Sequence, residues 1–334
     1  MNKKSILITG VAGLLGSRLA DWIVENHPEY EVVGIDNLFG GYIENVNYKV
    51  VFYNADLSKD SISKIFEWHN IEYVFHFAAY APEGLSYFMP MFNDKSNMLA
   101  TDNVLKECVN HNVKRLVYTS SMAVYGLGKN DGEPFDENDM PSPIDPYGVA
   151  KYACEQNIKI FGDHFGLDWC IIRPHNVYGV KQNIWDKYRN VLGIWMYQIL
   201  NNEPMLIYGD GEQTRAFSFI DDCLESFWNA AVREEASKEI INVGGEKAYS
   251  IKEAAKLLCE ITGYSNVEYR ESRHEVKHAT ATAEKSKQIL GYKQSTSLKD
   301  GLIKMWEWAK TQPMRRQYKW NNYEIEKGIY SYWK

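Results

Sequence analysis

The feature that most constrains the fold of this chain is a glycine-rich turn near the N-terminus. The turn lies between an apolar run and a helical pattern. Residues 5–10, Ser-Ile-Leu-Ile-Thr-Gly, form a short apolar run of the kind found in buried parallel strands. Gly10, Gly13 and Gly16 follow at a spacing that allows a tight turn and close packing of a helix on a strand. From Leu15 an i, i+4, i+7, i+8 repeat predicts an amphipathic helix. The chain therefore opens with the strand–turn–helix unit of a parallel sheet.

Such a turn can bind the phosphates of a dinucleotide. The helix after it offers free backbone N–H groups and a partial positive charge to an anion. Asp36 ends the second apolar run, residues 31–36, and lies 20 residues beyond Gly16. A carboxylate there accepts hydrogen bonds from ribose hydroxyls and repels a 2′-phosphate, which favours NAD over NADP. The alternative is that Asp36 only starts a loop, but strand, turn, helix and acid together favour the first interpretation.

Further strand-like runs alternate with helical or loop sequence through the first half of the chain. This alternation is typical of a doubly wound parallel α/β sheet. After about residue 178 the pattern becomes irregular, and we expect a smaller α/β substrate-binding domain. The expected cofactor-binding domain comprises residues 1–177 and 219–246, and the smaller one residues 178–218 and 247–334. The later expected strands are residues 48–55, 73–79, 115–121, 168–174 and 240–244, and the later expected helices are residues 194–200, 251–262 and 298–310.

Composition and charge exclude several classes of protein. Hydrophobic residues make up 45% and charged residues 24% of the 334 positions, which argues against disorder. No apolar run reaches the length of a membrane span, and the N-terminus lacks the apolar core of a signal peptide. Five scattered cysteines without a Cys-x-x-Cys pair predict a reduced, cytoplasmic protein with no metal site. A net charge of −7 disfavours a general nucleic-acid binder.

The last 24 residues, from Thr311, combine basic and aromatic side chains. Two interpretations are open. Such a mixture can bind single-stranded nucleic acid. In an acidic chain, however, it favours a tail that packs against its own domain or against a neighbouring subunit.

A tyrosine and a lysine four residues apart predict a proton-transfer site. Tyr147 and Lys151 follow Pro146, which suits the first turn of a helix, so both side chains would share one helix face. A lysine ammonium favours the phenolate and would lower the pKa of Tyr147, which makes this residue a candidate general base. Ser121 ends an expected strand at the ligand-binding edge of the sheet, where a hydroxyl can contact a substrate oxygen. Ser120 competes for the same role.

Several further motifs accompany this set. They are His76-Phe-Ala-Ala79, Asn97, Ser121-Met-Ala-Val-Tyr-Gly126, Arg173-Pro-His-Asn176-Val-Tyr-Gly179, the run from Gly209 to Phe217, and Asp221-Asp222. With the glycine turn, Asp36 and the Tyr147/Lys151 pair, they resemble the extended short-chain dehydrogenase/reductase family, and within it the nucleotide-sugar epimerase/dehydratase branch. The resemblance extends to about residue 310. It implies a Rossmann domain that binds NAD, a UDP-sugar substrate and a homodimer.

The resemblance assigns cofactor contacts along the carboxyl edge of the sheet. Lys151 would hold the nicotinamide ribose, Tyr147 would exchange a proton with a sugar hydroxyl, and Ser121 would complete the catalytic set. No metal is implied. The implied cofactor-binding residues are Gly10, Gly13, Leu14, Leu15, Gly16, Asp36, Asn37, Asp56, Leu57, Phe77, Ala78, Ala79, Asn97, Tyr147, Lys151 and Pro174.

The resemblance also assigns a UDP-sugar site. Asn176 and Arg215 match positions that hold the diphosphate, and a forked guanidinium suits that charge. Tyr208 matches an aromatic residue that stacks on uracil. A small residue at Ala279 would leave room for an N-acetyl group on the sugar. The implied substrate-binding residues are Glu83, Ser121, Asn176, Val191, Tyr208, Arg215, Arg273, Glu275 and Ala279.

Glu83 has two interpretations. It lies in residues 80–86, the segment expected to face the sugar, and either hydrogen-bonds a sugar hydroxyl or is a solvated loop acid. A carboxylate near the sugar would disfavour UDP-glucuronate by charge repulsion. Lys187 or Arg189 could offset that repulsion.

The residues after Ser121 narrow the expected chemistry. Related 4,6-dehydratases carry an Asp-Glu pair there and decarboxylases carry a glutamate, whereas this chain has Met122 and Ala123, which cannot move a proton. The resemblance therefore implies an enzyme that epimerises C4 of UDP-glucose or UDP-N-acetylglucosamine through a 4-keto intermediate. The alternatives are a UDP-glucuronate 4-epimerase, another nucleotide-sugar dehydratase or reductase, and a non-catalytic protein that senses NAD.

Overall fold

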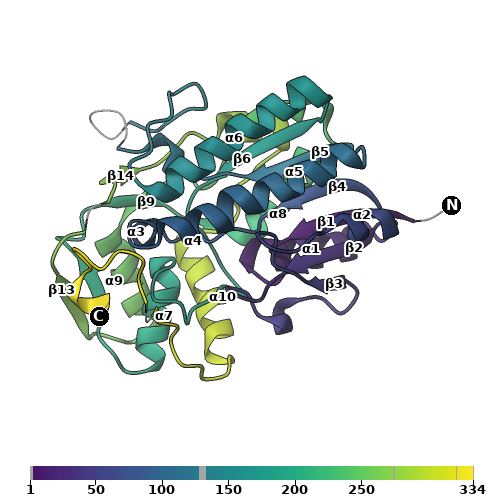
Figure 1. Ribbon diagram of the computed structural model, residues 1–334. Helices are drawn as coiled ribbons and strands as arrows, with labels where there is room; N and C mark the ends of the chain where they lie inside the picture. The colour runs from purple at the N-terminus through teal and green to yellow at the C-terminus, as the bar shows by residue number, and fades with distance from the viewer. Residues whose placement is uncertain (1–2, 128–132, 274, 321, 334) are drawn as a thin grey trace.

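A seven-stranded parallel sheet forms the centre of the computed structural model, which describes residues 3–127, 133–273, 275–320 and 322–333 (Figure 1). The strands lie in the order β11-β6-β5-β4-β1-β2-β3. The chain thus winds outward from β1 first in one direction and then in the other, which is the predicted doubly wound order. These strands are β1 (Lys4–Thr9), β2 (Glu31–Asp36), β3 (Val51–Asn54), β4 (Asn70–His76), β5 (Arg115–Thr119), β6 (Trp169–Pro174) and β11 (Glu239–Val243).

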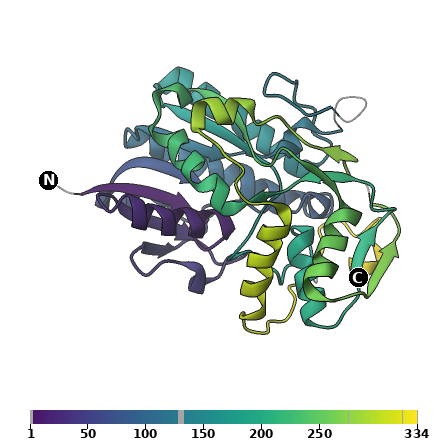
Figure 2. The same ribbon diagram turned by 180° about the vertical axis from the view of Figure 1, so that it is seen from behind.

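Helices cover both faces of this sheet (Figures 1 and 2). Because successive side chains of a strand point to opposite faces, Ile6 and Ile8 of β1 belong to one buried core and Leu7 belongs to the other. The first core is closed by α1 (Leu14–Asn26) and α8 (Ile220–Val232), and the second by α2 (Ser63–Trp68), α5 (Ala100–Asn110) and α6 (Pro146–Phe165). The predicted alternation of strands and helices is therefore confirmed.

Three predicted strands differ from the structure by more than one residue at an end, and one of them, predicted as residues 115–121, ends at Thr119. The run predicted from residue 48 becomes a strand only at Val51, because Asn47 accepts a hydrogen bond from the N–H of Lys49 (3.0 Å) and closes a turn. Tyr48 is 89% exposed in that turn. The run predicted as residues 73–79 ends at His76. Its last three residues leave the sheet and line a cavity instead.

A smaller α/β part lies beside the large sheet (Figure 2). Its own apolar core includes Trp195, Met205, Leu258 and Met305. The helices are α7 (Val191–Leu200), α9 (Ile251–Thr262) and α10 (Leu298–Lys310). The strands pair as β8 (Met205–Tyr208) with β13 (Val267–Arg270), β9 (Thr214–Ala216) with β12 (Ala248–Ser250) and β14 (His278–Ala279), and β7 (Val177–Tyr178) with β10 (Ser218–Phe219). The exact division of the chain into two domains stays a prediction.

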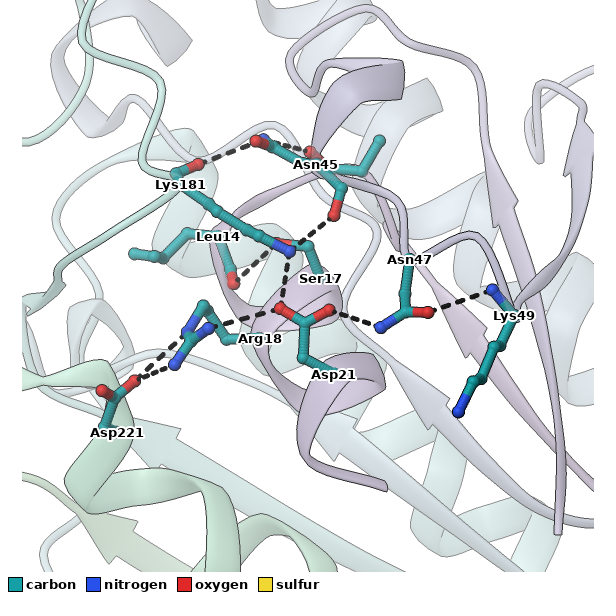
Figure 3. Close-up of polar contacts among 10 residues, drawn as sticks. Leu14, Ser17, Arg18, Asp21, Asn45, Asn47, Lys49, Lys181 and Asp221 are labelled. Atoms are coloured by element: carbon teal, nitrogen blue, oxygen red, sulfur yellow. Dashed lines mark hydrogen bonds and ion pairs between the residues drawn. The ribbon is translucent and has the colours of Figure 1, made fainter. Parts of the chain in front are cut away.

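A polar network joins the first helix to the loop that leads into the smaller part (Figure 3). Lys181 donates from Nζ to the carboxylate of Asp21 on α1 (2.6 Å) and to the carbonyl of Asn45 (2.8 Å). Arg18 reaches from α1 to Asp221 on α8 (2.8 Å). Lys181 has a φ of +73°, a left-handed conformation that is uncommon for a lysine. The network therefore holds a strained loop against α1.

Three further features bear on the classes of protein considered from composition. All five cysteines are free thiols, and four of them are buried. Among the residues with described coordinates, none of the helices is both long and apolar enough to cross a membrane. Those same residues contain no group of three or more His, Cys, Asp or Glu side chains that could hold a metal ion.

A fully buried ion pair attaches α6 to the sheet. Arg173 of β6 donates from Nε and Nη2 to the two carboxylate oxygens of Glu155 on α6 (2.9 and 2.6 Å), and neither side chain is more than 2% exposed. Ser120 donates a third hydrogen bond to the same carboxylate. The guanidinium lies 4.7 Å from the ring centre of Tyr125. Burial opposes the charged form of Arg173, but Glu155 keeps the pKa of that guanidinium above its ordinary value.

We predict that Glu155→Ala lowers the free energy of unfolding by about 3–5 kcal/mol, because it leaves the Arg173 charge buried without a partner. Urea denaturation measures the loss. The double variant Glu155→Leu/Arg173→Met is the control, since an apolar pair of similar volume should recover most of it. A loss below about 1 kcal/mol for the single variant would show that the pair does not hold α6.

Candidate active site

A cavity of about 1020 Å³ lies at the carboxyl edge of the large sheet. Residues directly after four of the strands line it: Gly10, Asn37, Phe77 and Ser120. Pro174, the last residue of β6, lines it as well. The smaller part supplies the facing wall through α7, β8 and β9. Because doubly wound sheets bind ligands outside the carboxyl ends of their strands, this cavity is the candidate active site.

The glycine turn has no room for side chains. Gly10 has a φ of +70°, and a Cβ placed on it would lie 2.8 Å from the backbone N of Ala78. A Cβ on Gly16 would collide with the carbonyl of Gly10. Gly13 is the N-cap of α1, and no side chain caps the helix there. The first N–H groups of α1 are therefore available to a phosphate.

Asp36 is fixed at the end of β2 by the backbone. Its carboxylate accepts hydrogen bonds from the N–H groups of Ala12 (3.0 Å) and Leu38 (2.8 Å). Burial raises the pKa of Asp36, and these two hydrogen bonds oppose the rise. The residue lines the cavity at the position expected to contact a ribose. The glycine turn has no side chains that would obstruct a ligand, and Asp36 lies near it. Together they fit the phosphates and the ribose of a dinucleotide.

All but one of the predicted cofactor-binding residues line the cavity. The exception is Asn97, which lies in the wide helical turn Lys95–Leu99 and is 1% exposed. Its Nδ2 donates to the carbonyls of Tyr80 (3.2 Å) and Asn93 (3.0 Å), so it braces packing behind the cavity. The predicted residues on the wall are Gly10, Gly13, Leu14, Leu15, Gly16, Asp36, Asn37, Asp56, Leu57, Phe77, Ala78, Ala79, Tyr147, Lys151 and Pro174.

Tyr147 and Lys151 lie in the first two turns of α6, as their spacing predicts. Asp145 caps the helix by accepting a hydrogen bond from the N–H of Gly148 (2.7 Å), and a proline occupies the first position. Lys151 Nζ lies 5.9 Å from the ring centre of Tyr147. It donates to the carbonyl of Thr119 at the end of β5 (2.8 Å). Both side chains are buried and line the cavity.

The two serines after β5 have different partners. Ser120 donates to the Glu155 carboxylate of the buried ion pair. Ser121 caps the short helical turn Met122–Tyr125, and its hydroxyl acts to lower the pKa of Tyr147. Ser121 is therefore the better candidate for the hydroxyl that meets the substrate.

Burial has the largest effect on the pKa of Tyr147. It raises the pKa of this phenol above its ordinary value, and the Glu83 carboxylate adds to the rise while Ser121 opposes it. The pKa of Tyr147 is therefore raised and not lowered as the Tyr147/Lys151 spacing predicts, because the effect of burial is the largest. Burial also lowers the pKa of Lys151, to about 8. A further positive charge beside the phenol would be needed to form the phenolate at neutral pH.

The smaller part brings cations and an aromatic ring to the cavity. The guanidinium of Arg273 lies 3.4 Å from the ring centre of Tyr208, so it covers a face that a stacked uracil would use. Arg215 forms an ion pair with Glu275 (3.0 Å). The predicted substrate residues on the wall are Glu83, Ser121, Asn176, Val191, Tyr208, Arg215, Arg273 and Glu275.

Ala279 is not among the cavity-lining residues, in contrast to its predicted place. It pairs with Arg215 in the ladder of β14 and β9. Its side chain packs against an apolar cluster that includes Val124, Tyr125 and Phe135. The size of residue 279 therefore does not indicate whether the sugar site has room for an N-acetyl group.

Glu83 is a cavity acid. It begins the short helix α3 (Glu83–Ser86), and its accessible surface faces the cavity. The hydroxyl of Ser86 donates to the Glu83 carbonyl (2.6 Å) and accepts from the N–H of Tyr147 (3.2 Å), which ties the two residues together. Glu83 is exposed to the cavity, and the protein walls around it raise the pKa of its carboxyl group to about 7, with Asp145 adding to the rise and Arg215 opposing it. The pKa of this carboxyl group is therefore raised beside α6.

Sequence reasoning left a further set of cavity residues without an assigned role. Some follow β2, some precede α7, and some come from the C-terminal tail. The tail packs against its own chain, where Trp320, Tyr323 and Trp333 join an apolar cluster, so the favoured interpretation of its composition is confirmed. The many aromatic residues of the tail indicate a packed segment, but the sequence of the tail does not indicate which surface it packs against. The unassigned cavity residues include Gly40, Gly41, Tyr188, Asn190, Gln317, Trp320, Tyr330 and Trp333.

Residues 6–244 match the NAD dependent epimerase/dehydratase family. This range holds the glycine turn, Asp36, Tyr147, Lys151 and nearly all of the large sheet. The chain therefore belongs to this family, and NAD is its cofactor.

Solved structures of UDP-sugar 4-epimerases are similar to this chain over almost their whole length. A UDP-glucose 4-epimerase from Thermotoga maritima, solved with UDP-glucose, is 32% identical with a TM-score of 0.86, covering 92% of this chain and 98% of that one. A UDP-glucuronic acid 4-epimerase from Bacillus cereus, solved with UDP-glucuronic acid and NAD, is 29% identical (TM-score 0.84, 92% and 99% covered). A UDP-N-acetylglucosamine 4-epimerase from Methanobrevibacter ruminantium, solved with UDP-N-acetylmuramic acid, is also 29% identical (TM-score 0.84, 92% and 98% covered).

We predict that Lys151→Met stabilises the protein without cofactor. The amine has a folded-state pKa of about 8 against an ordinary 10.5, so charging it opposes folding fully below pH 8 and no longer above its unfolded pKa. The gain at pH 7 is at most roughly 3 kcal/mol, reduced by the loss of the hydrogen bond to the Thr119 carbonyl. Urea denaturation from neutral to alkaline pH measures it, with Lys159→Met on the same helix as the control. A variant less stable than the parent at every pH would contradict the prediction.

Proposed function

We propose that this protein is a UDP-sugar 4-epimerase. The observation that carries the proposal is the cavity-facing set of Tyr147, Ser121 and Lys151 beside a groove that fits NAD. Met122 and Ala123 follow Ser121 and are buried, and neither side chain can supply an acid for elimination of water. The similarity to solved 4-epimerases of three different UDP-sugars supports the same reaction class.

The proposed mechanism uses the residues at the carboxyl edge of β5 and the start of α6. NAD, when bound, would supply the hydride acceptor and donor for C4 of the sugar and a positive charge. Tyr147 removes the proton of the sugar 4-hydroxyl and later returns it, while Ser121 hydrogen-bonds the same oxygen. Lys151, which lines the same cavity, would hold the nicotinamide ribose of the bound cofactor. The 4-keto sugar turns over before reduction on its other face, so no net oxidation occurs.

The distribution of charge fits a firmly held nucleotide and a loosely held sugar. Arg215, Arg273 and Lys187 line the cavity and can meet a diphosphate. A sugar near Tyr147 would meet mainly hydroxyl, carboxyl and aromatic groups. Such an arrangement anchors one end of the substrate while the ketone at the other end rotates.

Glu83 favours a sugar without a negative charge. Its carboxyl group is ionised above pH 7 and would then repel the carboxylate of UDP-glucuronate. UDP-glucose and UDP-N-acetylglucosamine carry no such charge on the sugar. The same carboxyl group, close to Tyr147, is able to act as an acid where Met122 and Ala123 are not, so dehydration is the second candidate.

A homodimer belongs to the same proposal. Val149 and Ile160 of α6 are 52% and 60% exposed, and Leu99, directly before α5, is 48% exposed. The two helices pack next to each other on the outer face of the sheet. A second copy of this chain would cover their exposed apolar side chains.

Proton NMR of the anomeric signals tests the reaction directly. We expect purified protein without added cofactor to convert UDP-N-acetylglucosamine or UDP-glucose into the galacto-configured sugar. A new methyl signal would instead identify a 4-keto-6-deoxy product and dehydration. No new product from either sugar, or from UDP-glucuronate, even with added NAD would favour a protein that only senses NAD.

Tyr147→Phe removes the proposed acid–base group and keeps the ring. We expect kcat to fall about 10²- to 10⁴-fold, the usual contribution of general acid–base catalysis, while NAD stays bound. Tyr152→Phe on the same helix is the matched control and should keep parental kcat. Activity of the first variant within tenfold of the parent would overturn the assignment of Tyr147.

Glu83→Gln should remove a pH-dependent preference among sugars. In the parent protein, the ratio of Kd for UDP-glucuronate to Kd for UDP-N-acetylglucosamine should rise roughly five- to tenfold as pH increases through 7, because about 1 kcal/mol of charge repulsion appears. Calorimetry measures both constants. The ratio should be independent of pH in Glu83→Gln and parental in Glu284→Gln, whose carboxylate is 80% exposed. A parental pH dependence in Glu83→Gln would contradict this role.

A further inference from the structure

The C-terminal tail, residues 313–320 and 322–333, crosses from the smaller part to the loops around the cavity. In Figure 1 the yellow tail leaves α10 and ends in the region of α3 and β13. Near its start, the N–H of Tyr318 donates to the carbonyl of Trp185 (2.8 Å). Near its end, the ring of Trp333 lies against Gly84, next to Glu83. The tail therefore spans the cavity from one side to the other.

Trp320 lies at the centre of an aromatic layer that the tail completes. Its ring centre is 4.9 Å from that of Phe92, 5.7 Å from Phe39 and 6.2 Å from Tyr80. Tyr318 adds a second tail ring, 5.6 Å from Phe39. Offset and edge-on ring pairs of this kind contribute about 0.5–1.5 kcal/mol each beyond the area they bury.

This layer joins the two loops that flank the cofactor groove. Phe39 follows Asp36, the predicted ribose ligand, and Tyr80 follows Ala79, at the opposite side of the groove. Trp320 contacts both rings, and Phe39, Tyr80 and Trp320 all line the cavity. The glycine turn lies at the sheet side of the same cavity. A dinucleotide bound on the turn would therefore lie between the sheet and this aromatic layer.

Polar contacts fix the tail in place. Trp320 donates from Nε1 to the hydroxyl of Tyr80 (3.3 Å), which in turn donates to the buried carboxylate of Asp186 (3.3 Å). Further along, Glu324 accepts hydrogen bonds from the N–H groups of Met91 (2.7 Å) and Phe92 (3.0 Å) in the first turn of α4 (Pro90–Asp94). These contacts are independent of any ligand.

The end of the tail is anchored to the substrate side of the cavity. Lys187 donates from Nζ to the carbonyl of Trp333 (3.1 Å), and Tyr323 donates to the same oxygen (3.1 Å). Trp333 is only 3% exposed. The compared epimerase structures are covered almost completely yet match 92% of this chain, so about one residue in twelve here has no counterpart in them. The matched family range, which ends at residue 244, does not include the tail.

We propose that the tail is part of the cofactor-binding site, and that Trp320 is a positioning residue that retains NAD. The bound dinucleotide leaves only when Trp320 separates from Phe39 and Tyr80. The tail thereby gives this chain a slow cofactor exchange, as suits a reaction in which the cofactor is regenerated in every turnover. The inference concerns NAD binding and does not depend on which sugar the enzyme uses.

The test is the rate at which bound NAD exchanges with radiolabelled NAD in the full-length protein without substrate. We expect Trp320→Ala to speed exchange about tenfold, as the removal of about 1.4 kcal/mol of ring–ring interaction implies, and to lose NAD during desalting. Trp320→Phe keeps an aromatic ring and should be intermediate. The control is Ile325→Ala, an exposed tail position outside the aromatic layer, which should exchange at the parental rate.

Thermal unfolding of each variant without cofactor separates retention from a general loss of stability. If Trp320→Ala does not fold, Trp320→Phe still decides the question. Parental exchange rates in the folded Trp320 variants would overturn the proposal, as would equal acceleration in Ile325→Ala. Failure of epimerisation with a normal exchange pattern would instead count against the proposed function alone.

Discussion

The buried Glu155–Arg173 ion pair determines where the proposed catalytic groups of this protein can lie. Glu155 is one helical turn beyond Lys151 and two beyond Tyr147, so all three share a face of α6. Because a buried carboxylate without its partner is costly, α6 has one favourable rotation against β6. That rotation directs Tyr147 and Lys151 to the carboxyl end of β5. The same carboxylate binds Ser120, which leaves Ser121 as the hydroxyl near the phenol.

The site holds ionisable groups in an environment that opposes their charged forms. Burial raises the pKa values of Tyr147 and Glu83 and lowers that of Lys151. The protonation of each group therefore depends on the charges of its neighbours and responds to a charged ligand. A cationic cofactor and an anionic diphosphate would change this balance.

The large sheet explains why so many distant segments meet in one cavity. Parallel strands deliver all their carboxyl ends to one edge, which places residues after β1, β2, β4 and β5 side by side. That edge is open in the sheet itself. The smaller part covers it from one side, and the tail with Trp320 and Trp333 completes the wall. Lys181, Asp21 and Arg18 add a polar link between the two parts near the glycine turn.

The sequence by itself determined the elements and motifs whose physics is local. Glycine at residues 10, 13 and 16, an acid at Asp36, and Tyr147 four residues before Lys151 are readable because turn geometry, strand ends and helix periodicity depend on nearby residues. The tertiary structure alone decided the rest. It directed Asn97 and Ala279 into packing, turned the Lys151 ammonium to a backbone carbonyl and brought Trp320 over the cofactor groove. Those outcomes depend on burial and on contacts between residues far apart in the chain, which no local pattern encodes.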